Sequence, residues 1–248
     1  MKELISQIFY DKKERGGYRT VQDELIAIGY KINHKKVQRI MRLLGLKCVK
    51  FSRKSRRYNS YKGNVGKTAK NRLNRRFDTP MPLQKLVTDI TEMKCKEDKK
   101  LYLSPILDLY NSEIISFSIS ESPNVDFVMQ SLQEAMIIIK KHAIYRTTIH
   151  SDQGFHYQNR RWVKTLKKNN IFQSMSRKGN CLDNASMESF FGILKQEMYN
   201  GEPLKTYKEL KQELEEYIYD YNYSRRKRKL DRLSPVQYRE NQGFYKVA

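Results

Sequence analysis

From Leu83 onward, short apolar segments alternate with longer amphipathic ones, and this order limits the possible folds more than any other feature. The expected strands are Leu86–Thr91, Leu101–Leu109, Glu113–Ser120, Thr147–Ser151 and Ile171–Met175. The expected helices span residues 124–141, Gln158–Asn169, Asn184–Met198 and Thr206–Tyr221. Three strands followed by alternating helices and strands predict an α/β fold, with helices packed on a mixed five-stranded sheet.

Residues 1–46 are expected to form a small helical domain ahead of this core. Asn33 is a suitable N-cap for its third helix, and Gly45 is a suitable end for the same helix. The outer face of that helix carries basic and polar residues: His34, Lys35, Lys36, Arg39 and Arg42. Two helices joined by a glycine-containing turn, the second of them basic, favour a helix-turn-helix that binds DNA. A three-helix bundle with a solvated basic face is the alternative.

Residues 47–82 are expected to form a basic linker. Between Lys47 and Phe77 the sequence has twelve Lys or Arg and no acidic residue. Such runs are often only solvated linkers. Here the length, the single sign of charge and the interspersed Tyr58 and Tyr61 favour a linker that follows a phosphate backbone.

The charge of the whole chain indicates a polyanionic partner. The sequence contains 49 Lys and Arg against 27 Asp and Glu, which gives a formal net charge of +22. Nucleic acid is the expected partner of such a chain, and a ribosomal-type protein is the alternative. No apolar run approaches the roughly 20 residues of a membrane-spanning helix. The cysteines, Cys48, Cys95 and Cys181, form no zinc-binding pattern and are expected to be reduced thiols in a cytosolic protein.

Three acidic residues occupy positions that suggest chemistry. Asp89 lies within the first expected strand, Asp152 directly follows the fourth, and Glu188 lies early in the next helix. A carboxylate among apolar residues is costly to bury without a partner, and a metal ion is one such partner. Carboxylate oxygens suit Mg²⁺ or Mn²⁺, and two ions can support an in-line displacement at phosphorus. We therefore expect these three residues to be catalytic and metal-binding, whereas Asp183 is interpreted as a helix-start residue.

Several basic residues near the expected site are candidate DNA contacts. Lys195 follows Glu188 by seven residues, which places it on nearly the same helix face, where it could hold a phosphate. Arg177 and Lys178 lie on the loop before that helix, although a solvated loop would explain them equally well. The run Arg225–Lys229 is a further candidate for phosphate binding.

The spacing and the flanking sequence resemble a known family. Thirty-five residues separate Asp152 from Glu188, as in the D, D, thirty-five residues, E signature of retroviral-integrase-like transposases. More narrowly, the chain is similar to the OrfB product of the insertion sequence 3 family. The matching segments are TDIT (88–91), LYLSPILD (101–108), HSDQGFHY (150–157), SMSRKGNCLDNASMESFFGILKQE (174–197) and the N-terminal GGYRT with INHKKVQRIMRLLGL. The likeness covers nearly the whole chain.

The resemblance implies a fold, a reaction and a domain order. An RNase H-like catalytic core would span residues 83–200, with a helix-turn-helix domain at 1–46 before it and a helical extension at 201–248 after it. The catalytic carboxylates would be Asp89, Asp152 and Glu188, and Lys195 corresponds to a lysine that contacts the DNA end in related integrases. The implied activity is Mg²⁺- or Mn²⁺-dependent cleavage and strand transfer at insertion-sequence ends.

The resemblance also implies partners and a location. We expect a homo-oligomer that binds the element ends and the target DNA in the bacterial cytoplasm, at the nucleoid. An upstream OrfA product is expected to act with the chain or to be fused to it. Two alternatives remain at this stage, a nuclease of RNase H type and a DNA-binding regulator with an inactive core. The intact set of three carboxylates argues against the second alternative.

Overall fold

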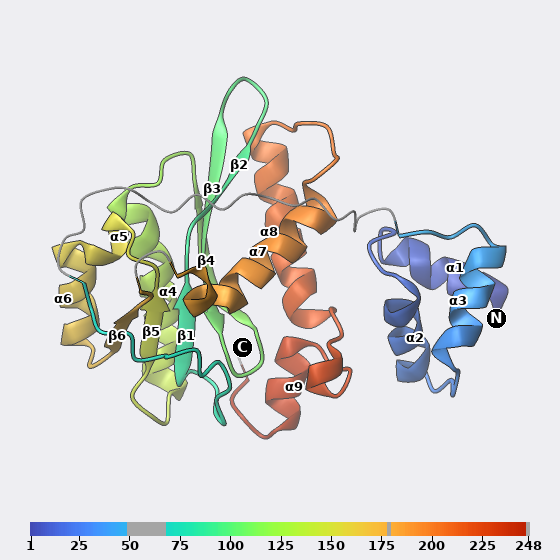
Figure 1. The fold of residues 1–248 in the computed structure, drawn as a ribbon, viewed down its shortest axis with the longest axis horizontal. Coiled ribbons are helices and arrows are strands. Elements are labelled where there is room, and N and C mark those ends of the chain that lie inside the picture. The colour runs from blue at the N-terminus through green and yellow to red at the C-terminus, as the bar shows by residue number, and fades with distance from the viewer. Residues whose placement is uncertain (49–67, 178–179, 247–248) are drawn as a thin grey trace.

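The computed structural model describes residues 1–48, 68–177 and 180–246 and divides them between a helical unit and a sheet-containing core (Figure 1). The strands are β1 Lys85–Thr88, β2 Thr91–Lys94, β3 Lys100–Asp108, β4 Ile114–Ser120, β5 Thr148–Ser151 and β6 Phe172–Met175. The α-helices are α1 Lys2–Asp11, α2 Tyr18–Ala27, α3 His34–Leu43, α4 Val125–His142, α5 Phe155–Gln158, α6 Arg160–Lys168, α7 Ala185–Met198, α8 Tyr207–Tyr223 and α9 Pro235–Asn241. Short 3-10 turns are η1 Cys181–Asn184 and η2 Arg228–Leu230. Within the described residues, no helix combines the length and apolar character needed to cross a membrane.

The sheet is mixed, as the sequence predicts, and β1 and β2 together take the place of the first predicted strand. β4 pairs with β3 along Tyr102–Leu107, so β1 and β2, which also pair with β3, must lie one after the other on its opposite edge. β5 pairs with β1, and β6 pairs with β5, both in parallel, whereas the pairs that involve β3 are antiparallel. The order across the sheet is therefore β4, β3, β1 with β2, β5, β6, as expected of an RNase H-like core.

The first expected strand is interrupted, which corrects the prediction of one strand over Leu86–Thr91. β1 ends at Thr88 and β2 begins at Thr91. Between them, Asp89 Oδ1 accepts a hydrogen bond from the Ile90 N–H at 2.8 Å, and this local bond competes with regular strand pairing. Asp89 thus lies beyond the carboxyl end of β1 rather than within a strand.

The expected helix over Gln158–Asn169 is also divided. α5 ends at Gln158 and α6 begins at Arg160. The residue between them, Asn159, has an extended ψ of 137°, and its side chain accepts a hydrogen bond from the Arg161 N–H. Asn159 therefore acts as an N-cap that starts α6 in a new direction.

Each face of the sheet is covered by its own pair of long helices. Alternate residues of β1 point to opposite faces, so Leu86 joins one buried cluster and Val87 the other. On the Leu86 face the cluster includes Val128, Leu132, Trp162 and Leu166 of α4 and α6. On the Val87 face it includes Phe190, Leu194, Leu214 and Ile218 of α7 and α8. α7, which carries Glu188, is thereby fixed directly on the strand that precedes Asp89.

The helical unit has a separate core. Its buried residues include Ile5, Phe9, Val21, Leu25, Val37 and Met41. The predicted cap of α3 is confirmed, because Asn33 accepts a hydrogen bond from the Lys35 N–H at 2.8 Å. The side chains predicted to contact DNA on this helix are exposed: Lys35, Lys36, Arg39 and Arg42. Figure 1 shows the unit beside the end of the core formed by α8 and α9, away from α4, α5 and α6.

Candidate active site

Asp89 and Asp152 lie at the same edge of the sheet because the strands before them are parallel neighbours. β1 and β5 pair in a register that places Val87 opposite His150. Extending this register by two residues places Asp89 opposite Asp152. Both side chains are partly exposed at the strand ends. The two acidic residues that the sequence singled out are therefore brought together by strand pairing.

Glu188 and Lys195 approach this edge from α7. Asn184, at the start of the helix, donates a hydrogen bond from Nδ2 to the Thr88 carbonyl at 3.4 Å and so connects α7 to the end of β1. Burial and the carboxylates of Asp152 and Glu188 together raise the pKa of Asp89 to about 8, whereas the hydrogen bond from the Ile90 N–H and the charge of Lys195 oppose the rise. Lys195 Nζ also donates to the Glu92 carbonyl at 2.9 Å. All four predicted residues therefore share one electrostatic environment.

The loop after β5 holds the Asp152 carboxylate through a glycine. The Gly154 N–H donates to Asp152 Oδ1 at 2.8 Å. A Cβ atom on residue 154 would lie only 2.9 Å from that same oxygen. Burial raises the pKa of Asp152, and this hydrogen bond opposes the rise. A side chain at this position would therefore displace the Asp152 carboxylate, which gives the glycine of the HSDQGFHY segment a physical role.

His150 supports the site from within the sheet. Its Nδ1 and Nε2 lie 2.8 and 3.1 Å from the hydroxyl oxygens of Ser174 and Ser176 on and after β6. Burial lowers the pKa of His150 to about 4, so the ring is neutral near pH 7. A neutral, fully enclosed imidazole with two hydroxyl partners holds β5 and β6 in register rather than exchanging protons.

Tyr157 lies beneath the two aspartates. The residue is buried, and its hydroxyl group has no hydrogen-bond partner among the described residues. Burial raises the pKa of Tyr157, and the nearby charges of Asp89 and Asp152 add to this rise. The phenol therefore stays protonated next to the carboxylates. In the sequence, only the short separation between Tyr157 and Asp152 indicated that this tyrosine lies near the aspartates.

The donor chemistry of the site fits a divalent cation. Asp89, Asp152 and Glu188 offer carboxylate oxygens, the hard ligands that Mg²⁺ and Mn²⁺ prefer. A cation would also relieve the mutual repulsion that raises the pKa of Asp89. Among the residues that the structure describes, no three His, Cys, Asp or Glu side chains are arranged closely enough to form a metal site as they stand.

The loop before α7 differs from its sequence interpretation. Asp183 does lie at the helix start, in η1 directly before α7, but its side chain is completely buried and accepts hydrogen bonds from the Arg177 guanidinium at 2.9 Å. Arg177 keeps 59% of its side chain exposed, so a DNA contact by this residue stays a prediction. Lys178, the other candidate on the loop, lies outside the described residues.

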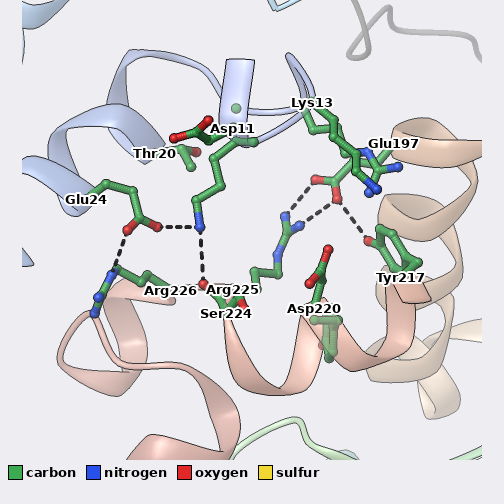
Figure 2. A pocket seen from close by; sticks show the side chains of 14 residues that line it. Asp11, Lys13, Thr20, Glu24, Glu197, Tyr217, Asp220, Ser224, Arg225 and Arg226 are labelled. Atoms are coloured by element: carbon green, nitrogen blue, oxygen red, sulfur yellow. Dashed lines mark hydrogen bonds and ion pairs between the residues drawn. The ribbon is translucent and has the colours of Figure 1, made fainter. Parts of the chain in front are cut away.

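Most of the basic run Arg225–Lys229 contacts acidic side chains. Arg226 binds Glu24 and Arg228 binds Asp23 of the helical unit, which docks against the end of α8 and encloses a pocket of about 220 Å³ (Figure 2). Arg225 binds Glu197 on α7, within the core itself. Burial and the charge of Arg225 together lower the pKa of Lys227 to about 7. Arg226 and Arg228 therefore join the two parts of the protein, whereas Lys229 is exposed and phosphate binding by this residue stays a prediction.

Comparison with protein families matches both parts of the chain. The integrase core domain family matches residues 79–181, and a second integrase core domain family matches residues 188–242. An HTH-like domain family matches residues 1–55. These matches agree with the RNase H-like topology of the core and with the three helices before it.

Curated relatives from several bacteria align with nearly the full length of the chain. The putative transposase InsK for insertion sequence element IS150 of Escherichia coli is 46% identical over 98% of this chain and 84% of its own. A transposase-like protein of Haemophilus influenzae is 49% identical over 84% of this chain and 94% of its own. The transposase InsF for insertion sequence IS3A of Escherichia coli is 33% identical over 97% of this chain and 82% of its own. The chain therefore belongs to the insertion sequence 3 family of transposases, and it is a DNA-cutting enzyme of DNA transposition.

Proposed function

We propose that this transposase uses Asp89, Asp152 and Glu188 to hold divalent cations, two Mg²⁺ or Mn²⁺ ions, for DNA cleavage and strand transfer. The observation that supports the proposal is the raised pKa of Asp89, about 8, to which burial contributes most and the charges of Asp152 and Glu188 contribute as well. The three carboxylates come from elements that are distant in sequence, after β1, after β5 and on α7. Carboxylates placed together at this cost favour a role in binding positive charge.

The proposed reaction takes place directly on the DNA. A 3′-hydroxyl freed at the element end attacks a second phosphodiester, and the bond to the leaving oxygen breaks as the new bond forms. Bound divalent cations would stabilise the charge that develops on the attacking and leaving oxygens. The negative charges of the three carboxylates would balance the positive charges of these cations. The reaction requires no nucleophile from the protein.

DNA binding is proposed for the basic surfaces outside the site. The exposed face of α3 would bind the DNA duplex through Lys35, Lys36, Arg39 and Arg42. Lys195 would bind a phosphate beside Asp89, because the positive charge of Lys195 is close enough to lower the pKa of Asp89. Arg177 and Lys178 would contact DNA at the mouth of the site.

The domain organisation, assembly and location are also proposed. Residues 1–46 would form the DNA-binding domain, 47–82 the linker, 83–200 the catalytic core and 201–248 its helical extension. The protein would act as a homo-oligomer on DNA, with or fused to an OrfA product, in the cytoplasm at the nucleoid. Cross-linking on element-end DNA, with and without a coexpressed upstream product, measures this assembly.

The variant Asp152→Asn tests the proposed chemistry. The substitution keeps the size and one acceptor oxygen of the side chain but removes its charge. Strand transfer in Mg²⁺ should fall by at least about a thousandfold, equivalent to several kcal/mol of lost transition-state stabilisation. Binding of element-end DNA, measured by fluorescence anisotropy, should remain unchanged.

Asp126→Asn is a matched control, since it removes an exposed carboxylate that is paired with Arg161 and is not one of the three proposed cation-binding residues. This variant should join DNA ends at the native rate. If Asp152→Asn still joined DNA ends in Mg²⁺, the proposed mechanism would be wrong.

A further inference from the structure

Asp183 connects separate segments of the chain beside the catalytic helix. Its side chain is completely buried, yet it accepts five hydrogen bonds. The Arg177 N–H, Nε and Nη2 donate at 3.0, 2.9 and 2.9 Å. Arg75 Nε and Asn71 Nδ2 each donate at 3.0 Å. Three of these five donors belong to the guanidinium groups of two arginines, so the junction is charge-assisted.

The donors come from two segments that are far apart in the sequence. Arg177 belongs to the loop that leads into α7, whereas Asn71 and Arg75 belong to the last part of the basic linker. The same part of the linker is held on β6, where Ser174 Oγ accepts hydrogen bonds from the Arg72 and Leu73 N–H groups at 2.8 and 3.3 Å. Arg75 also donates from Nη2 to Asn180 Oδ1 at 2.9 Å. Hydrogen bonds therefore join the end of the linker to β6 and to Asn180 and Asp183 before α7.

The residue after Asp183, Asn184, connects these segments to the active site. Asn184 is buried, and its amide nitrogen donates to the carbonyl of Thr88, the residue before Asp89. Its Oδ1 is buried as well and has no hydrogen-bond partner among the described residues. Asn184 precedes Glu188 by four residues, about one turn along the helix. The position of Glu188 relative to Asp89 is thus set at the start of α7.

We propose that Asp183 and Asn184 are positioning residues for Glu188: Asp183 fixes the start of α7 to the linker, and Asn184 fixes it to the end of β1. Neither residue touches the reacting atoms. Because Asn71 and Arg75 share the Asp183 carboxylate, the linker from the helix-turn-helix domain takes part in setting the catalytic geometry. This inference rests on the proposed role of Glu188 in cation binding.

The test replaces Asp183 with Asn in the full chain, which keeps one acceptor oxygen but removes the charge that holds two guanidinium groups. We expect strand transfer to fall about ten- to a hundredfold, as for other residues that orient metal ligands. Arg177, a proposed DNA contact, keeps its charge in this variant, so the loss should appear mainly in kcat rather than in KM. Binding of Mn²⁺ to the protein without DNA, followed by electron paramagnetic resonance, should weaken by a similar factor.

A higher Mn²⁺ concentration should partly restore strand transfer in Asp183→Asn but not in Glu188→Gln, a difference that general destabilisation would not produce. Asp126→Asn, which also loses an arginine partner, should behave as the native protein does. Native rates and native Mn²⁺ binding in a folded Asp183→Asn variant would overturn the proposal.

A second variant covers the case in which Asp183→Asn does not fold. Arg75 is 43% exposed, so Arg75→Gln should fold, and it should weaken Mn²⁺ binding and strand transfer in the same direction but less. Native behaviour of Arg75→Gln would then overturn the role of the linker. Failure of the proposed function is distinguishable, because in that case Asp152→Asn and Glu188→Gln would themselves remain active.

Discussion

Two groups of carboxylates in this protein, one buried within the fold and one partly exposed at the strand ends, have opposite surroundings. Glu113 binds the Arg239 guanidinium through two contacts of 2.8 and 3.1 Å, and Glu197 binds Arg225 at 2.6 and 2.8 Å. Asp89 instead accepts its hydrogen bond from a backbone N–H and faces other carboxylates, which raise its pKa. The first group is neutralised within the fold, whereas the second concentrates negative charge.

The difference separates structural from functional acids better than burial does. Arginine partners make Glu113 and Glu197 parts of the framework, because each pair is neutral overall. The carboxylates at the strand ends lower the stability of the cation-free fold, and such a cost is typical of sites that bind a charged ligand. Asp108 is an exception, because its pKa is raised although its role is structural. Burial raises its pKa to about 7, but its oxygens accept hydrogen bonds from the N–H groups of Leu83, before β1, and Tyr110, after β3.

The largest effect on stability is expected from Glu113→Gln. Arg239 is 1% exposed and Glu113 is 5% exposed, so the variant leaves a buried guanidinium without its counter-charge. Breaking such a pair costs about 3–5 kcal/mol, measured as the free energy of unfolding in urea. Glu134→Gln on the exposed face of α4 is the control and should change it little. A loss below about 1 kcal/mol, typical of surface pairs, would remove the contrast between the two groups.

Asp89→Asn should change the free energy of unfolding in the opposite direction and stabilise the cation-free protein. The pKa of Asp89 is about 8 in the folded protein against 3.8 for a free side chain. Between these values the folded state holds a proton that the unfolded chain has lost, so stability of the cation-free protein falls as pH rises from about 4 to about 8. An asparagine does not titrate. In EDTA at pH 8 the variant should therefore be more stable, by roughly 1–3 kcal/mol.

Thermal unfolding at pH 5 and pH 8 measures this difference. The advantage of Asp89→Asn should shrink at pH 5, where the native carboxyl group is protonated. Added Mn²⁺ should raise the melting temperature of the native protein more than that of the variant. A variant that melts below the native protein at pH 8 in EDTA would show that Asp89 belongs with the framework acids.

The smallest effect is expected where the helical unit meets the core. Arg228 Nε binds Asp23 at 3.0 Å, but the Arg228 side chain is 40% exposed and Arg232 binds the same carboxylate. Arg228→Ala should therefore cost less than about 1 kcal/mol, the range of partly exposed pairs. A double-mutant cycle with Asp23→Asn, read by urea unfolding, measures the coupling. A coupling as large as that of Glu113 with Arg239 would place this joint among the buried framework pairs.

Much of the architecture could be read from local patterns. Asn33 was identified as a cap from the sequence and accepts the expected backbone hydrogen bond, and the helix expected from residue 124 begins directly after the cap Asn124. The break between β1 and β2 could not be read, because Leu86, Val87 and Ile90 continue an apolar pattern across it. The break follows from the local hydrogen bond of Asp89 and from the pairing of both strands with β3.

The proposed catalytic residues could be predicted from the sequence, but the residues that position them could not. Asp89, Asp152 and Glu188 stood out through their places in the element pattern and through the family spacing. Asp183 did not, because its partners Asn71 and Arg75 are more than a hundred residues away in the sequence. The same holds for Asp23 and Arg228. Contacts between distant segments leave no mark on local spacing, so they require the fold.

The occupied arginines at the joint affect how DNA binding should respond to salt. A protein that binds DNA releases one group of condensed counterions for each phosphate that it neutralises, and this number sets the steepness of the salt dependence. Arg225, Arg226 and Arg228 already have carboxylate partners, so they release few counterions while the helical unit stays docked. A count of basic residues therefore overstates the number of phosphates that this end of the molecule can neutralise.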